Sequence, residues 1–174
     1  MKPADALVES GATVPYPSRT ANFHHEIELV VALGKGGRDI PAAQALECVF
    51  GYAVGNDFTR RDLQQNSRSA GLPWDTGKGF DHSAAISAIR QASQGHISSG
   101  RIWLSVNGRT RQQADVADMI WPVPEIIAEL STLFALTAGD LIYTGTPAGV
   151  GALRKADKVE GGIDGVGLLS NVIE

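Results

Sequence analysis

Acidic and histidine side chains open an otherwise apolar stretch over residues 23–33, Phe-His-His-Glu-Ile-Glu-Leu-Val-Val-Ala-Leu. Its alternating first half and β-branched second half predict a strand that enters the core. Because residues two apart in a strand share a face, His24, Glu26 and Glu28 are expected to point together. Adjacent carboxylates repel each other unless a cation lies between them or one keeps its proton. A hard divalent ion such as Mg²⁺ or Mn²⁺ prefers such oxygen donors; two solvated glutamates on an edge strand are the alternative.

A third carboxylate follows the next apolar run. The pattern over residues 49–58 predicts a buried strand that ends at Asn56 and Asp57, where a buried carboxylate needs a partner. With Glu26 and Glu28, Asp57 would complete three carboxylate ligands and leave positions on an ion for water and substrate oxygens, as a Lewis-acid site requires. A surface salt bridge is the alternative for Asp57.

Polar side chains suited to an anionic ligand come next. Arg61 and Gln64 are three apart, so they share one face of a helical turn. Arg61 can clamp a carboxylate through its planar guanidinium, with a surface salt bridge as the alternative, and Gln64 can hold a carbonyl oxygen or a water. Lys78 stands between two glycines in a stretch predicted as a loop, residues 67–81. Its ammonium can there approach a reacting centre and stabilise an enolate or oxyanion, and an exposed loop lysine is the alternative.

The glycine-rich run over residues 144–151 suggests an anion-binding loop. The Lys-Ser/Thr pair of a P-loop is missing and no helix is predicted after the run, so a nucleotide site is disfavoured. Backbone amides and the Thr146 hydroxyl holding a small carboxylate fit the composition better.

The histidines offer an alternative donor set. A His/Glu/Glu site for zinc or iron would include His24, but Asp57 provides a third ligand for an all-oxygen site without it. His82 and His96 fall in predicted loops without visible partners.

Short strands dominate the elements that must position these residues. Helices are predicted over residues 42–48, at one turn over 61–66, and from Pro122 or Pro124 onward. Residues 102–106 and 109–113 flank Asn107-Gly108, which is typical of a hairpin with a type I′ turn. Further strands are predicted over residues 84–89, 141–144, 158–163 and 166–173. Because strands outnumber helices and do not alternate with them, the sequence indicates a mixed, β-rich α/β fold rather than a doubly wound parallel sheet.

The composition is that of one soluble globular domain. The chain has 174 residues, with 43% hydrophobic and 20% charged residues and a net charge of −4. This balance disfavours nucleic acid and anionic membranes as partners. No apolar run approaches the roughly 20 residues of a membrane span, and no signal-peptide pattern opens the chain. The single cysteine, Cys48, lies in an apolar segment, so we interpret it as a core residue in a reducing cytoplasm.

Several short patterns then follow one another in a fixed order: H-H-E-x-E-L at residues 24–29, N-D-x-x-x-R-D-x-Q at 56–64, W-x-x-x-K at 74–78, V-N-G at 106–108 and G-D-x-I-x-T-G-T-P-x-G-V-G at 139–151. Together they resemble the fumarylacetoacetate hydrolase family, over a span from Lys2 nearly to the C-terminus. Within that family the chain looks most like the small acylpyruvate hydrolases, in particular the fumarylpyruvate hydrolases of the gentisate route of aromatic catabolism.

The resemblance implies a fold and a set of roles. The fold would be the mixed β-sandwich/roll of the family's C-terminal domain with few short helices, usually assembled as a homodimer. The Mg²⁺ or Mn²⁺ ligands would be Glu26, Glu28 and Asp57. Lys78 and Gln64 would be catalytic, and the substrate site would be lined by Arg61, Gln64, Lys78, Thr146 and, from the short Lys-Pro pair, Lys2.

The family also places a His-Glu pair in a lid segment upstream of the Lys-Pro pair, whereas this sequence begins at Met1-Lys2-Pro3. We therefore expect residues 1–174 to form a single catalytic domain that lacks the lid, with impaired activity. The expected reaction is cytoplasmic, metal-assisted hydrolysis of a carbon–carbon bond in a 2,4-dioxo acid, with fumarylpyruvate giving fumarate and pyruvate. Alternatives are an oxaloacetate decarboxylase or dienoate isomerase on the same site, a non-catalytic dimer that binds 2-oxo acids, and a structural dimerisation module.

Overall fold

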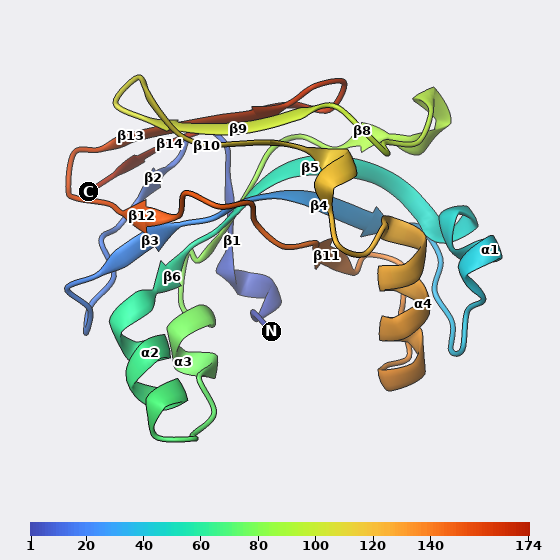
Figure 1. The fold of residues 1–174 in the computed structure, drawn as a ribbon, viewed down its shortest axis with the longest axis horizontal. Helices are drawn as coiled ribbons and strands as arrows, with labels where there is room; N and C mark the ends of the chain where they lie inside the picture. The colour runs from blue at the N-terminus through green and yellow to red at the C-terminus, as the bar shows by residue number, and fades with distance from the viewer.

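Two long antiparallel strands, β4 (Ile27–Leu33) and β5 (Val49–Asp57), pair at the centre of the main sheet. The computed structural model describes residues 1–174, and in it these strands form an arch from the middle of the molecule to the end near residues 42–48 (Figure 1). Their sheet has the order β1-β7-β5-β4-β11, and β8 pairs with the other half of β5. The remaining strands of this sheet are β1 (Leu7–Glu9), β7 (Ala84–Ile86), β8 (Arg90–Gln91) and β11 (Leu141–Tyr143).

A second sheet covers one face of the arch (Figure 1), and the hydrophobic core fills the space between them. It has the order β10-β9-β13-β14-β2. Its strands are β2 (Thr13–Val14), β9 (Arg101–Val106), β10 (Arg109–Asp115), β13 (Lys158–Ile163) and β14 (Gly167–Ile173). A small third sheet, β12-β3-β6, is formed by β3 (Phe23–His25), β6 (Thr59–Arg60) and β12 (Gly151–Ala152).

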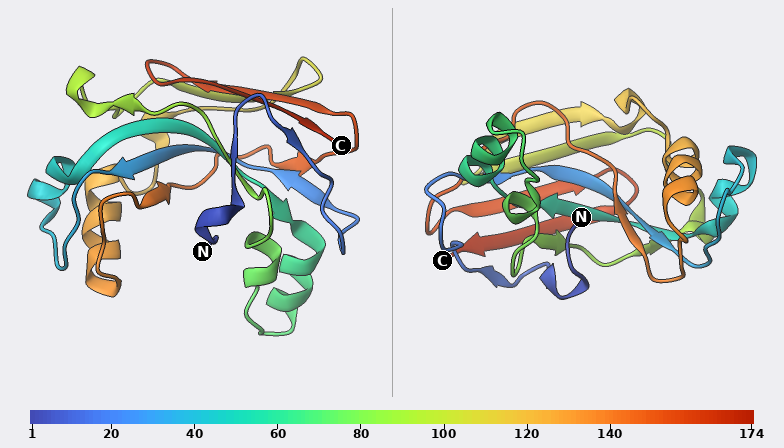
Figure 2. Two further views of the ribbon diagram at one scale, coloured as in Figure 1. Left: turned by 180° about the vertical axis from the view of Figure 1, so that it is seen from behind. Right: turned by 90° about the horizontal axis from the view of Figure 1, so that it is seen from below.

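Helices lie on the opposite face of the arch, in two groups at its two ends (Figures 1 and 2). One group is α2 (Arg61–Ser69) with α3 (Asp75–Lys78), and the other is α1 (Ala42–Ala45) with α4 (Val123–Leu133). Short 3-10 turns are found at Ala4–Ala6, Leu46–Cys48, Ala92–Gln94 and Val116–Asp118. The N-terminal segment enters between the two helical groups, beneath the middle of the arch (Figure 2). None of the helices has the length and apolar composition that crossing a lipid bilayer requires.

Most predicted elements are confirmed, and so is the β-rich mixed class. The predicted strand over residues 23–33 is present as β3 and β4, interrupted only at Glu26. Asn107 and Gly108 have φ angles of 51° and 76°, as a type I′ turn between β9 and β10 requires. Only two strand pairs, β1 with β7 and β14 with β2, are parallel, so the sheet is not doubly wound. Cys48 is buried in the core as expected.

Two predictions were wrong. Residues 67–81 are not all loop, because α2 continues to Ser69 and a helical turn, α3, ends at Lys78. Glycine and proline favour a loop locally, but the packing of α3 against α2 overrides that preference. His96 does have a partner, since its Nδ1 lies 2.8 Å from the Tyr52 hydroxyl. That contact joins residues 44 positions apart and left no local signal.

Candidate metal and substrate site

The three predicted carboxylates meet on the underside of the arch. In the register of β4 and β5, Glu28 lies opposite Gly55, and the Asp57 N–H donates to the Glu26 carbonyl at 2.8 Å. Because opposite residues of an antiparallel pair share a face, Asp57 points to the same side as Glu26 and Glu28. One oxygen from each carboxylate lies within 4.8 Å of the others. The predicted convergence is therefore confirmed.

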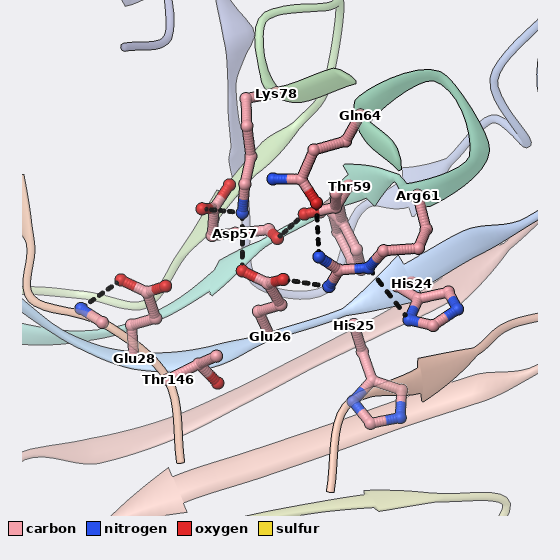
Figure 3. A network of polar contacts seen from close by, with 12 residues as sticks. His24, His25, Glu26, Glu28, Asp57, Thr59, Arg61, Gln64, Lys78 and Thr146 are labelled. Atoms are coloured by element: carbon pink, nitrogen blue, oxygen red, sulfur yellow. Dashed lines mark hydrogen bonds and ion pairs between the residues drawn. The ribbon is translucent and has the colours of Figure 1, made fainter. Parts of the chain in front are cut away.

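Cationic side chains surround two of these carboxylates (Figure 3). Lys78 Nζ lies 2.6 Å from Glu26 Oε2 and 2.6 Å from Asp57 Oδ2, so one ammonium bridges β4 and β5. The Arg61 guanidinium forms an ion pair with the other oxygen of Glu26. Lys2 Nζ lies 2.8 Å from Asp57 Oδ1. The structure thus brings Lys2, the residue with the weakest sequence signal, into the cluster.

Close packing of α2 and α3 positions the polar side chains. A Cβ on Gly77 would lie 2.8 Å from Gln64 Cβ, so this position of α3 needs glycine to approach α2 so closely. Lys78 follows directly and reaches the carboxylates. Arg61 donates to Gln64 Oε1 at 2.5 Å, which confirms that these two side chains share a face of α2. Lys2 Nζ also donates to the carbonyls of Phe58, at 2.9 Å, and Lys78.

The electrostatics of the cluster are uneven. Burial first, then the charges of Asp57 and Glu26, raise the pKa of Glu28 to about 8, and the Gly145 N–H at 2.8 Å and Lys78 oppose the rise. Burial disfavours the charge on Lys78, but the two carboxylates outweigh that penalty and raise its pKa. Glu26 and Asp57 each form ion pairs with cationic side chains, whereas no cation contacts Glu28.

These residues fit a hard divalent cation. The donor set consists of carboxylate oxygens, and the Lys78 ammonium already occupies a position between two of them. Glu28 is ionised at neutral pH only at a cost that a nearby cation would remove. The sequence expectation of a Mg²⁺ or Mn²⁺ site is consistent with this chemistry.

The histidine alternative finds less support. His24 Nε2 lies 2.9 Å from Asn22 Oδ1, and its Nδ1 accepts from Arg61 Nε at 3.4 Å, so both ring nitrogens are engaged. Burial, followed by the charge of Arg61, lowers the His24 pKa. The His25 ring lies on the other side of the strand from the carboxylates (Figure 3) and bonds to Gln112 at 2.8 Å.

The loop after β11 borders the cluster, but it differs in part from the predicted anion cradle. The Gly145 amide is not free for a ligand, because it donates to Glu28 Oε2. Thr146 lies beside Glu28 in Figure 3, and its Oγ1 accepts from Gln112 Nε2 at 2.8 Å. A cavity of about 600 Å³ opens beside the same loop, between β11 and α4, but its lining is mainly apolar and includes none of the three carboxylates.

The order of these motifs and this geometry agree with comparisons to known proteins. The family model described as fumarylacetoacetate (FAA) hydrolase C-terminal matches residues 1–174. The chain belongs to the fumarylacetoacetate hydrolase family. The β-rich mixed fold expected from the resemblance is the fold found here.

Named members of the fumarylacetoacetate hydrolase family align along nearly the whole chain. Fumarylpyruvate hydrolase of Ralstonia sp. is 50% identical over 169 residues, which are 97% of this chain and 88% of that protein. The mitochondrial oxaloacetate tautomerase FAHD1 of Mus musculus is 43% identical, over 95% of this chain and 76% of its own length. The crystal structure of fumarylpyruvate hydrolase from Pseudomonas aeruginosa, in complex with Mn²⁺ and pyruvate, has a TM-score of 0.97 and 51% identity, covering 99% of this chain and 76% of that one.

Sequence reasoning missed two residues that support the site. Gln112 is buried in β10 and hydrogen-bonds both β4 and the Thr146 loop. No sequence signal pointed to it: the regular register of the hairpin would set Arg111 opposite the buried Leu104, and only a β-bulge between Thr110 and Gln112 places Gln112 there. Tyr143 was the other, since a Cβ on Gly55 would come within 2.5 Å of its ring. That contact depends on β11 lying beside β4, which no local pattern reveals.

Proposed function

We propose that residues 1–174 act as a single catalytic domain that hydrolyses a carbon–carbon bond of an acylpyruvate, with fumarylpyruvate as the preferred substrate. The observation that carries this proposal is the convergence of Glu26, Glu28 and Asp57 beside the cations Lys78 and Arg61. Products would be pyruvate and, from fumarylpyruvate, fumarate. The relatives named fumarylpyruvate hydrolase support this substrate class.

Glu26, Glu28 and Asp57 would hold a Mg²⁺ or Mn²⁺ ion, for which their oxygens are suitable donors. When bound, the ion supplies Lewis-acid polarisation of substrate oxygens. The Mn²⁺ in the Pseudomonas aeruginosa structure, which also contains pyruvate, supports this assignment, because that enzyme is 51% identical over the aligned residues.

The chain's own polar residues would bind and orient the dioxo acid. Arg61 donates once from each of its three nitrogens, to His24, Gln64 and Glu26, so its two terminal nitrogens each keep one further N–H for a substrate carboxylate. Lys78 stays protonated, since Asp57 and Glu26 raise its pKa, and its ammonium can stabilise negative charge that develops on an enolate oxygen. Gln64 accepts from Arg61 through Oε1, which leaves its amide N–H groups to orient water or the distal carbonyl.

One water molecule supplies both the hydroxyl group and the proton that this hydrolysis consumes. Its hydroxyl adds to the acyl carbon and becomes part of the released carboxylic acid. The electron pair of the broken carbon–carbon bond passes to the pyruvate fragment as its enolate, and a proton completes pyruvate. Lys2, whose pKa burial lowers although Asp57 opposes the effect, uses its three N–H groups for Asp57 and the Phe58 and Lys78 carbonyls, so it would favour the substrate carboxylate through its nearby positive charge.

The test compares substrates on one preparation of the protein. With Mn²⁺ or Mg²⁺ present, fumarylpyruvate, acetylpyruvate and oxaloacetate are each followed by loss of enol absorbance and by pyruvate release through lactate dehydrogenase. We expect the largest kcat/KM for fumarylpyruvate, and Asp57→Asn should abolish the activity. Glu47→Gln is the matched control, because Glu47 forms an exposed ion pair with Lys35. Full activity of Asp57→Asn would contradict the proposed site.

Oxaloacetate chemistry is the second candidate, favoured by the identity of 43% with an oxaloacetate tautomerase. Its enolate would use the same cationic groups, either for tautomerisation or for decarboxylation. Loss of the oxaloacetate enol without pyruvate release would indicate a tautomerase, and pyruvate release without hydrolysis of acylpyruvates would indicate a decarboxylase. Oxalate binding without turnover of any of these acids would favour a non-catalytic binding protein.

We also propose that the chain functions as a homodimer in the cytoplasm. Large apolar side chains remain exposed beside the cavity near α4, with Ile120 95% and Trp121 47% exposed. Such a patch is typical of a protein interface. Light scattering should give twice the mass of the 18.4 kDa chain, and Ile120→Lys should shift the protein towards the monomer.

A further inference from the structure

The Gln112 carboxamide joins two segments that carry the candidate site. Gln112 lies in β10 of the second sheet and is 1% exposed. Its Oε1 accepts from the Ile27 N–H at 3.2 Å and lies 2.8 Å from His25 Nδ1. Its Nε2 donates to Thr146 Oγ1 at 2.8 Å and to the Pro147 carbonyl at 2.9 Å. A primary amide has two donor hydrogens and two acceptor sites, so all of them are used.

The bond to Ile27 fills a gap in the sheet. β11 pairs with β4 only as far as Val30, and β12 resumes pairing at His25. Between these points the chain leaves the sheet, so the Ile27 N–H meets the Gln112 side chain instead of a strand. A buried N–H without a partner is costly. Gln112 therefore supports the strand position between the two glutamates of the cluster.

The partners of Gln112 also fix the orientation of its carboxamide. The Ile27 N–H can only donate and the Pro147 carbonyl can only accept. A flipped amide would therefore place its NH₂ group against the Ile27 N–H and its oxygen against the Pro147 carbonyl. Nε2 must therefore face Thr146, whose hydroxyl accepts on that side. The Thr146 hydroxyl hydrogen is then left for a different acceptor.

We propose that Gln112 is a positioning residue that presents the Thr146 hydroxyl as a hydrogen-bond donor to an anionic ligand at the carboxylate cluster. This rests on the proposed function, because the ligand oxygen would belong to a 2-oxo acid. Thr146 follows Gly145, whose amide contacts Glu28, and the residue lies beside Glu28 in Figure 3, so rotation of its side chain or of a bound ligand would bring the hydroxyl to a ligand oxygen at the cluster. A carboxylate or enolate oxygen only accepts, and a preset donor matches it.

The test uses oxalate as the probe on the Mn²⁺-loaded protein, with calorimetry for binding and KM and kcat measured separately. Thr146→Val should weaken oxalate binding by roughly 10- to 100-fold, the effect of losing a hydrogen bond to a charged group, whereas Thr146→Ser should restore it. Gln112→Glu should weaken binding similarly, because the new carboxylate accepts the threonine hydrogen. Mn²⁺ affinity should change by less than about threefold, since that carboxylate still accepts from the Ile27 N–H.

The double variant separates this role from a general loss of structure. Gln112→Glu combined with Thr146→Val should bind oxalate no worse than Thr146→Val alone, because both changes remove the same donor. Gln113→Glu, on the exposed side of the same strand, is the matched control and should bind like the wild type.

Two outcomes would overturn the proposal: wild-type oxalate affinity in Thr146→Val, or additive losses in the double variant. If Gln112→Glu does not melt cooperatively, Gln112→Met takes its place in the cycle for oxalate binding only, because methionine removes the donor to Thr146 but also leaves the Ile27 N–H without its acceptor. A wild-type protein that binds oxalate but turns over no dioxo acid would contradict the proposed reaction and leave the role of Gln112 intact.

Discussion

The Lys78 ammonium lies 2.6 Å from Asp57 Oδ2, although the two residues come from different elements and are 21 positions apart. The same nitrogen is 2.6 Å from Glu26 Oε2. One short helix thus places a positive charge between two strands whose carboxylates would otherwise face each other. This ion pair network couples the stability of the site to its chemistry.

Lys78→Met should separate these two contributions. Without the ammonium, Glu26 keeps only its ion pair with Arg61 and Asp57 only its ion pair with Lys2, so the metal-free protein should lose up to about 3 kcal/mol of unfolding free energy, the lower end of the cost of a broken buried pair. Mn²⁺ should restore most of this loss, because a cation replaces the missing charge. Turnover should still fall by about 10²–10³-fold, since the donor to the enolate oxygen is gone. Urea unfolding with EDTA or Mn²⁺, together with kcat, measures both effects.

Lys35→Met provides the surface control for that experiment, because Lys35 pairs with Glu47 where both side chains are more than half exposed. It should change neither unfolding nor turnover noticeably. Equal destabilisation of Lys78→Met with and without Mn²⁺ would mean that the carboxylates do not share one cation site.

Metal binding should stabilise the fold through Asp57. At free Mn²⁺ 100-fold above its Kd, the unfolding free energy should rise by about 2.7 kcal/mol. For a chain of this size that corresponds to a Tm increase of roughly 5 to 10 °C. Asp57→Asn should abolish the increase in a thermal melt, whereas Glu47→Gln should retain it. A full Mn²⁺ shift in Asp57→Asn would remove Asp57 from the ligand set.

The metal-free protein should lose stability as the pH rises, because of Glu28. Its pKa is raised, mainly by burial, from the usual 4.5 to about 8, so the folded state binds this proton more tightly than the unfolded chain. The stabilisation is complete below about pH 4.5 and is lost progressively as the pH rises towards 8. Glu28→Gln carries no titrating group and should flatten this slope. Urea unfolding in EDTA at pH 5, 6.5 and 8 gives the comparison, and an unchanged slope in the variant would assign it to another group.

The same proton should oppose metal binding. Below about pH 8, Mn²⁺ must displace the Glu28 proton, so affinity should increase with pH by at most about tenfold per unit and then level off. Calorimetry in buffers of different ionisation enthalpy would measure the released proton directly. Binding without proton release at pH 6.5 would contradict the raised pKa.

Gly55 should tolerate no side chain. A Cβ at this position would lie 2.4 Å from Val30 Cγ2 and 2.5 Å from Tyr143 Cε1, directly opposite Glu28 in the register. We expect Gly55→Ala to cost roughly 1–3 kcal/mol of unfolding free energy and to weaken Mn²⁺ binding, because the ring must move. Tyr143→Phe keeps the ring and loses only the hydroxyl bond to the Ala85 carbonyl at 3.1 Å, so it should retain metal binding. Chemical denaturation and metal titration of both variants test this; a Gly55→Ala protein as stable as the wild type would disprove the contact.

Local patterns explain why much of the architecture was predictable. Period-two alternation fixed which side chains of β4 share a face, and Asn107-Gly108 fixed the β9–β10 hairpin, since both depend only on neighbouring residues. Lys78 shows where local patterns fail to predict the structure. Its two flanking glycines favour a loop, yet α3 forms because Gly77 allows α2 to approach at Gln64.

By itself, the sequence determined that Glu26 and Glu28 lie side by side, because the strand period is a local property of the backbone. It also determined the family, through the order of its motifs. Only the tertiary structure decided that Asp57 lies opposite Glu26 and that Lys2 reaches both Asp57 and Lys78. It also decided that Gln112 connects β4 to the Thr146 loop. Those contacts join segments far apart in the chain, and their geometry follows from sheet register and core packing, which no single stretch of residues encodes.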